Sequence, residues 1–186
     1  MSYHDGRPLQ AAYAYDDTPS GALVVTVFRC AMAGFSLGDS DCWNIGFRAL
    51  GNAMPPDAAG ALFGQFYGFV RALLACAQKP LSWRPANCRG LCGDEALALS
   101  MIEAAQRGDP TGLLAAAALL LGVDELGDAL QATQSLATAL ARRGVFVRAP
   151  RDEEPCGFDL CPRRRLHRAP FEGRARHARR LFDHVA

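Results

Sequence analysis

Helix start and stop signals recur along the middle of the chain and constrain its fold more than any other feature. The Asp109-Pro110 pair places an acidic N-cap before a proline at the first helical position, and Gly122 ends the Ala- and Leu-rich stretch that follows. Pro55-Pro56 opens a longer apolar stretch that Pro80 stops. These signals predict an all-α fold, a single compact bundle of about five to six helices.

Two further helices have weaker boundary signals. Residues 39–41 offer N-caps for a short amphipathic helix, and Gly51-Asn52 marks its expected end. Asp124 is the expected N-cap of the last clear helix, which Gly144 ends. Both helices extend the same all-α pattern.

The stretch from Ala22 to Gly34 is ambiguous. Val24, Val25 and Val27 favour a strand, because β-branched side chains fit a pleated surface. The almost uninterrupted apolar character of the stretch also suits a buried helix. Since everything downstream is helical, a lone strand would lack a partner for its backbone, and we favour a helix.

Three regions follow from the pattern. Residues 1–20 are expected to form an irregular N-terminal arm, residues 21–148 the helical bundle domain, and residues 149–186 a linker with a basic C-terminal extension. The chain is 50% hydrophobic and 21% charged, which supports a packed core and excludes disordered and fibrous classes. No secretory signal is evident, and no apolar run reaches the roughly 18 charge-free residues of a membrane span. A cytoplasmic protein without membrane contact is the expectation.

Charge is divided unevenly along the chain. Residues 1–141 hold 8 Lys+Arg against 13 Asp+Glu, whereas residues 142–186 hold 12 against 6. Arginine binds phosphate and carboxylate groups through a planar, bidentate fork. The cluster therefore predicts, as one alternative, a nucleic-acid or acidic-partner contact formed by Arg163, Arg164, Arg165, Arg168, Arg174, Arg176, Arg179 and Arg180.

Cysteines form the second chemical feature. Cys88 and Cys92 lie in one proline- and glycine-bearing loop, and Cys156 and Cys161 lie in another. Structural zinc favours paired thiolates about two to four residues apart, so the two loops could close a tetrahedral site, with His167 able to replace one sulfur. Four unlinked thiols are the alternative.

A thiol-redox enzyme is a competing hypothesis at the same loop. Cys92 stands just before a helix capped by Asp94, and a helix N-terminus favours the thiolate over the thiol. An exposed Cys88/Cys92 pair with a lowered pKa would oxidise reversibly.

Small residues recur every fourth position along the helix expected over residues 57–78. Glycine costs about 1 kcal/mol relative to alanine inside a helix, so a close neighbour must offset the cost. We expect that neighbour to be a helix of the same chain, or otherwise the same helix of a second subunit in a homodimer. The stripe consists of Gly60, Gly64, Gly68, Ala72 and Cys76.

Residues 34–38 match the G-x-S-x-G pattern of serine hydrolases. That motif needs a strand before it, a helix after it and a large parallel sheet around it, none of which this sequence predicts. A tight turn between two helices explains Gly34 and Gly38 better.

One stretch carries a resemblance. The segment Pro85-Ala86-Asn87-Cys88 to Cys92, followed by Asp94-Glu95-Ala96-Leu97, resembles a family of small uncharacterised helical bacterial proteins, and residues 132–137 are similar as well. The resemblance spans residues 22–145. It implies an all-α fold and no particular chemistry. Taken together, the sequence predicts a non-enzymatic helical binding or regulatory module, with zinc held by the cysteine loops as an optional structural element.

Overall fold

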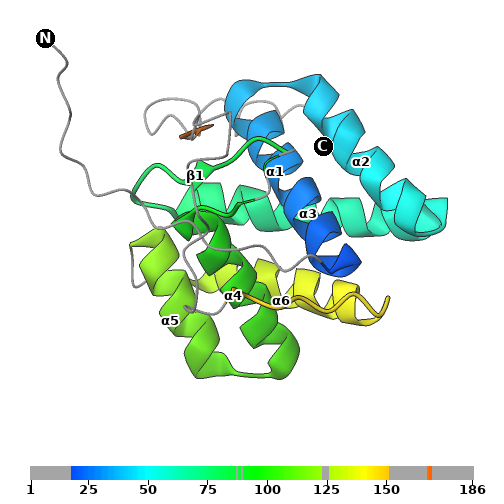
Figure 1. Ribbon diagram of the computed structural model, residues 1–186. Coiled ribbons are helices and arrows are strands. Elements are labelled where there is room, and N and C mark those ends of the chain that lie inside the picture. Colours follow the sequence, from blue (N-terminus) through cyan, green and yellow to red (C-terminus); the bar gives the residue numbers. More distant parts are fainter. Residues whose placement is uncertain (1–17, 87, 89, 123–125, 151–166, 169–186) are drawn as a thin grey trace, which may run out of the picture.

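A computed structural model describes residues 18–86, 88, 90–122, 126–150 and 167–168, and within them the fold is all-α (Figure 1). Two strands of two residues each are the only extended elements in these ranges. The elements in chain order are α1 (Pro19–Leu37), α2 (Ser40–Ala53), α3 (Pro56–Cys76), β1 (Ser82–Trp83), α4 (Gly93–Arg107), α5 (Pro110–Leu121), α6 (Gly127–Ala141) and β2 (His167–Arg168). The predicted helical bundle is confirmed.

Local signals determine most helix ends. Thr18 caps α1 by accepting a hydrogen bond from Gly21 N at 3.2 Å, and Gly38 ends it with a φ of 68°. Asp109 accepts from Gly112 N at 2.9 Å to cap α5, which ends at Gly122. The stretch from Ala22 to Gly34 is therefore helical, as expected.

Two predicted boundaries were wrong. Helix α2 continues through Gly51-Asn52 to Ala53, because Pro55 sets its end: the residue before a proline avoids the helical conformation, and Met54 is extended with φ −156° and ψ 164°. Helix α6 begins at Gly127 with Leu126 as N-cap, three residues beyond Asp124, which lies outside the described residues.

The helices form two groups joined through α6. Helices α1 and α2 pack as a pair against α3, and α4 packs against α5 (Figure 1). Helix α6 contacts both α3 and α4, so it connects the groups. The largest fully buried side chains come from both groups and from the loop before α4: Trp83, Phe66, Phe69, Met32, Leu50, Leu62, Leu73, Leu81, Leu91, Met101, Ile102 and Leu120.

After α6 the chain returns along α4. The side-chain amide of Gln106 donates to Val145 O and accepts from Val147 N, both at 2.9 Å, and Glu103 accepts from Ala149 N at 2.9 Å. Farther along the chain, β2 pairs antiparallel with β1, so that Arg168 lies opposite Ser82 and His167 opposite Trp83. Residues 167–168 are thus attached by their backbone to the loop that precedes α4.

Two helices, α1 and α3, are long and apolar enough to cross a membrane by length and composition alone. In α1 the apolar window is 67% buried inside the bundle, as in the core helix of a packed domain, whereas in α3 it is 33% buried. Helix α3 is therefore the more exposed of the two, and its exposed positions are mainly glycine, alanine and polar residues.

Gly34 is needed for a close helix contact. The glycine lies inside α1, directly under the indole of Trp43 from α2, and an added Cβ would stand 2.6 Å from Trp43 Cζ2. Gly38 forms the turn predicted between the two helices, but Gly34 is present because no larger residue fits beneath the ring.

We expect Gly34→Ala to destabilise the fold by about 1–3 kcal/mol, because the new methyl group overlaps the large, half-buried ring of Trp43. Gly51→Ala is the matched control: Gly51 lies in α2 with nothing within 4 Å of the added Cβ, so this variant should gain about 0.5–1 kcal/mol. Urea unfolding followed by circular dichroism measures both. Equal stability of the two variants would contradict the packing argument.

Candidate functional site

The start of α4 gathers the polar groups of the preceding loop. Asp94 lies in the first turn and accepts hydrogen bonds from Ser82 N at 2.8 Å and from Lys79 Nζ at 3.0 Å. The carboxylate therefore holds the loop that contains β1 against the helix N-terminus, where negative charge is favourable.

Glu95 forms the shortest and most deeply buried ion pair in the described part of the molecule. Its carboxylate accepts from Arg29 Nε at 2.6 Å and from Arg29 Nη2 at 3.1 Å, and the two residues are only 1% and 3% exposed. It also accepts from Arg84 N at 2.9 Å and from Cys92 N at 2.8 Å. With four donors on two oxygens, this carboxylate is committed to holding structure.

Arg29 completes the arrangement from the side of α1. Its Nη1 donates to Cys88 O at 2.6 Å, and its Nη2 donates to Gly90 O at 2.7 Å. Arg29 thus binds carbonyl oxygens of the loop while Glu95 binds N–H groups of the same loop. We call this unit, made of Arg29, Glu95 and the backbone groups of the loop that they bind, the Arg29–Glu95 clasp.

The thiol of Cys92 is enclosed by the clasp. Cys92 is fully buried and its Sγ donates to Ser82 O at 3.2 Å. Burial, followed by the negative charge of Glu95, raises the pKa of this thiol far above its usual range. The expectation from the helix dipole was a lowered pKa; the structure gives the opposite direction, because desolvation and the nearby carboxylate outweigh the dipole.

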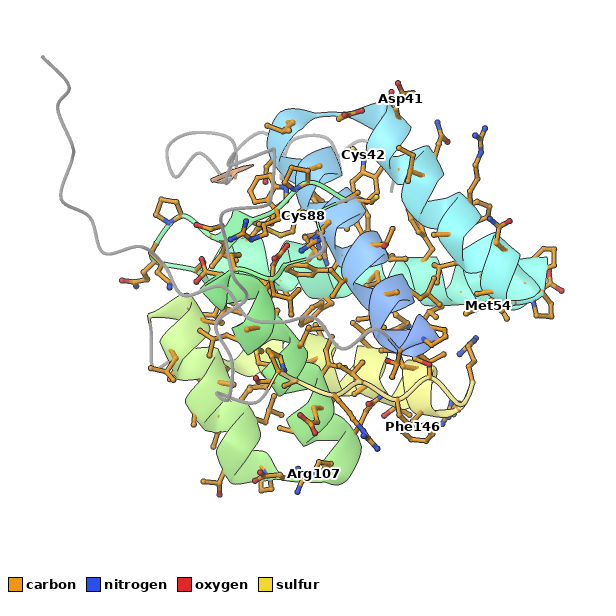
Figure 2. The ribbon with its side chains drawn as sticks, in the orientation of Figure 1. Asp41, Cys42, Met54, Cys88, Arg107 and Phe146 are labelled. Carbon is orange, nitrogen blue, oxygen red and sulfur yellow. The ribbon has the colours of Figure 1, made fainter. Side chains whose placement is uncertain are left out.

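Cys88 differs from Cys92 although the two share a loop. Cys88 is half-buried, and its carbonyl oxygen accepts the hydrogen bond that attaches it to the clasp. Figure 2 shows Cys88 beside the upper part of α1. Because Cys92 is fully buried, the two positions do not form the exposed thiol pair that the redox hypothesis describes.

The pKa values of three other thiols are raised as well, which keeps these thiols protonated: Cys30, Cys42 and Cys76. Burial raises the pKa of Cys30 to about 11, and burial with the Asp39 hydrogen bond raises that of Cys42 to about 12. Cys42 Sγ donates to Asp39 Oδ2 at 3.3 Å. These thiols pack as small hydrophobic residues with weak donors.

The predicted zinc ligands fall into two sets. Cys156 and Cys161 lie outside the described residues, whereas Cys88, Cys92 and the backbone of His167 lie within them. The β1–β2 pairing brings His167 to the loop whose Ser82 carbonyl binds Cys92. Within the described ranges no three His, Cys, Asp or Glu side chains form a group suited to a metal ion. The zinc site stays a prediction.

The predicted arginine contact is described only at one point. Arg168 belongs to β2, and the other seven arginines of the cluster (Arg163, Arg164, Arg165, Arg174, Arg176, Arg179 and Arg180) lie outside the described residues. Nucleic-acid or acidic-partner binding through this cluster therefore stays a prediction from the sequence.

The glycine stripe of α3 faces away from the rest of the described molecule. Gly60 and Gly64 are exposed, Gly68 is half-buried, and an added Cβ at any of the three would have no neighbouring atom within 4 Å. The expected neighbour from the same chain is absent among the residues described. Only the end of the stripe turns inward, where Cys76 contacts the backbone of Ala129 in α6.

A groove lies beside this stripe, between α3 and α6. Its volume is about 470 Å³. Neutral polar side chains dominate its lining, and two arginines lie at one end: Ala61, Gln65, Gln131, Gln134, Ser135, Thr138, Ala139, Arg142 and Arg143. Arg143 Nη1 donates to Ala139 O at 2.8 Å, while its buried Nε has no hydrogen-bond partner in the described ranges.

An aromatic cluster borders the opposite side of the stripe. Trp43 makes edge contacts with Phe35 and Phe63 at centroid distances of 5.0 Å and 5.8 Å. Tyr67 stacks at a tilt on Phe35 at 4.7 Å, and Phe47, which is 45% exposed, contacts Phe63. The cluster joins α1, α2 and α3 and leaves part of its surface open to solvent.

Sequence reasoning missed the clasp. The sequence predicts Asp94 as a helix cap, and Arg29 is a single charge inside the apolar stretch from Ala22 to Gly34. That isolated charge was the available signal, because a buried cation needs an anionic partner. Nothing in the sequence identified the partner, which is 66 residues away.

Comparison with protein-family models, with curated proteins and with solved structures finds no match.

Removing one partner of the clasp should be strongly destabilising. We expect Arg29→Met to lower the free energy of unfolding by about 3–5 kcal/mol, because Glu95 then stays buried without its cation. Glu103→Gln is the control: it removes an exposed i,i+4 pair with Arg107 and also weakens one bond to Ala149 N, for about 1 kcal/mol in total. Chemical denaturation measures both, and similar losses would contradict the role of the clasp.

Cys92 should resist alkylation in the folded protein. Iodoacetamide reacts with thiolates, and burial together with a raised pKa leaves Cys92 without one at neutral pH. Peptide mass spectrometry should find Cys92 modified only after unfolding, and a chelator should leave this protection unchanged. Rapid labelling of native Cys92, or labelling that begins when metal is removed, would show that the thiol is an exposed nucleophile or a metal ligand.

Proposed function

We propose that this chain is a non-enzymatic helical binding module whose binding face is the exposed side of α3. The polar groups that would suggest chemistry, Asp94, Glu95 and the Cys92 thiol, are engaged by the loop before α4. Because these groups are hydrogen-bonded within the fold, they stabilise the scaffold. The exposed surface of α3 is the feature that a partner could bind.

The observation that carries the proposal is the exposure of the glycine stripe. Glycine in a helix interior costs about 1 kcal/mol per residue relative to alanine, so Gly60, Gly64 and Gly68 together destabilise α3 by about 3 kcal/mol. No atom of the described residues comes within 4 Å of their missing side chains. A partner backbone that approaches closely on this face would offset the cost.

The surroundings of the stripe suit a partner helix. At about 100° per residue, Phe63 and Tyr67 lie on one side of Gly64, and Ala61 and Gln65 lie on the other. The first side leads to the aromatic cluster and the second to the α3–α6 groove. A helix laid along the stripe would meet apolar rings along one edge and hydrogen-bonding amides along the other.

Site-specific photo-cross-linking in the host cell tests the proposal. We expect p-benzoylphenylalanine at position 61, an exposed alanine beside the stripe, to give a discrete cross-linked product, because a partner covers the face and a probe at its edge leaves the glycines open. The same probe at position 52, an exposed asparagine of α2, is the matched control. Absence of a product at position 61, or equal products at both positions, would refute the binding face.

A further inference from the structure

We infer that the partner is a second copy of this chain, bound antiparallel through α3 so that Asp57 of each copy pairs with Arg71 of the other. The inference rests on the proposed function and identifies the occupant of the α3 face. It commits to a homodimer with a two-fold axis at Gly64.

The exposed face of α3 has a symmetric pattern. Asp57, Gly64 and Arg71 are spaced seven residues apart and therefore lie close to one line along the helix. Gly60 and Gly68 stand four residues to either side of Gly64. Small residues thus occupy the middle of the face, and charges of opposite sign occupy its two ends.

This pattern is self-complementary under a two-fold rotation. An axis through Gly64 brings Gly60 of one copy onto Gly68 of the other and brings Asp57 onto Arg71, twice. Closed dimers need such a patch, because the same surface must serve both partners. A parallel arrangement would place like charges together.

Within one chain the two charges cannot satisfy each other. They are 14 residues apart on one straight helix, about 21 Å along its axis. Both side chains are exposed, and neither forms an ion pair with any other residue that the structure describes. A second copy supplies the missing partner for each, by charge complementarity at the ends of the same face.

Glycine packing in the middle of the face and opposite charges at its two ends therefore favour the same occupant.

A bilayer is the other occupant to consider, because α3 is long and apolar enough to cross one. The exposed face, however, consists of glycine and alanine together with Asp57, Gln65 and Arg71. Such a face presents little apolar area to lipid and would bury charges in it. The second copy is favoured, and lipid binding becomes an outcome of the test.

Light scattering on the purified full chain measures the assembly directly. We expect a mass of about 40 kDa, twice the 20.0 kDa of one chain, with dissociation on dilution. Gly64→Leu should give a monomer with unchanged helix content, because the monomer has open space at that position. Gly51→Leu, the matched control on α2, should remain dimeric.

Charge exchange tests the register. Asp57→Arg should raise the dimer dissociation constant by about tenfold, and Arg71→Asp by a similar factor. The double variant Asp57→Arg/Arg71→Asp should restore dimerisation, since it regenerates the pairs with exchanged signs. Failure of the double variant to recover would overturn the antiparallel register.

A monomeric wild-type chain, or a dimer that Gly64→Leu leaves intact, would overturn the inference. So would flotation of the wild-type chain with phosphatidylcholine vesicles that Gly64→Leu abolishes. The proposed function is tested separately: a monomeric chain that still cross-links another protein at position 61 keeps the binding face and loses only the second copy.

Discussion

The buried ion pair between Arg29 and Glu95 is the interaction on which the rest of the fold depends. Removing two charges from water costs free energy, and this pair is tolerated because both groups find hydrogen-bond partners inside the protein. The guanidinium donates to Glu95, Cys88 O and Gly90 O. The carboxylate also accepts from Arg84 N and Cys92 N. The pair joins α1 to the start of α4 and fixes the irregular loop between α3 and α4 by its backbone. The loop therefore holds its shape without regular secondary structure of its own.

Several features follow from a fixed loop. Strand β1 is presented at a defined place, so that β2 can pair with it and attach residues 167–168. The thiol of Cys92 is enclosed and kept protonated, because the same carboxylate that orders the loop also opposes a second negative charge. The residues that most resemble a reactive site are thus parts of the scaffold, and this leaves the exterior of α3 as the surface through which we propose that the protein acts.

Helix α3 combines two requirements. One side carries Leu62, Phe66, Phe69 and Leu73 into the core, and the other side exposes Gly60 and Gly64. Packing of the buried side stabilises the helix, so the exposed side can carry glycines although glycine has a low helix propensity. A smooth face on a rigid helix is pre-organised for a close partner, since little conformational freedom is lost when it is covered.

The sequence by itself determined where the helices are, because caps, prolines and C-terminal glycines act within a few residues of each helix end: Asp109-Pro110, Gly122 and Gly38 all behave as their local chemistry requires. For the segment from Ala22 to Gly34 the sequence only favoured a helix over a strand, and the structure confirms the helix. Only the tertiary structure decided which groups meet. Arg29 and Glu95 are far apart in the chain, the indole of Trp43 rests on Gly34, and the glycines of α3 face outward, where an internal neighbour was expected. The physical reason is twofold. Glycine has no side chain, so a pattern of apolar residues along the sequence does not show which way it faces. The partner of a buried charge is determined by how the helices pack and not by the spacing of the two residues in the sequence.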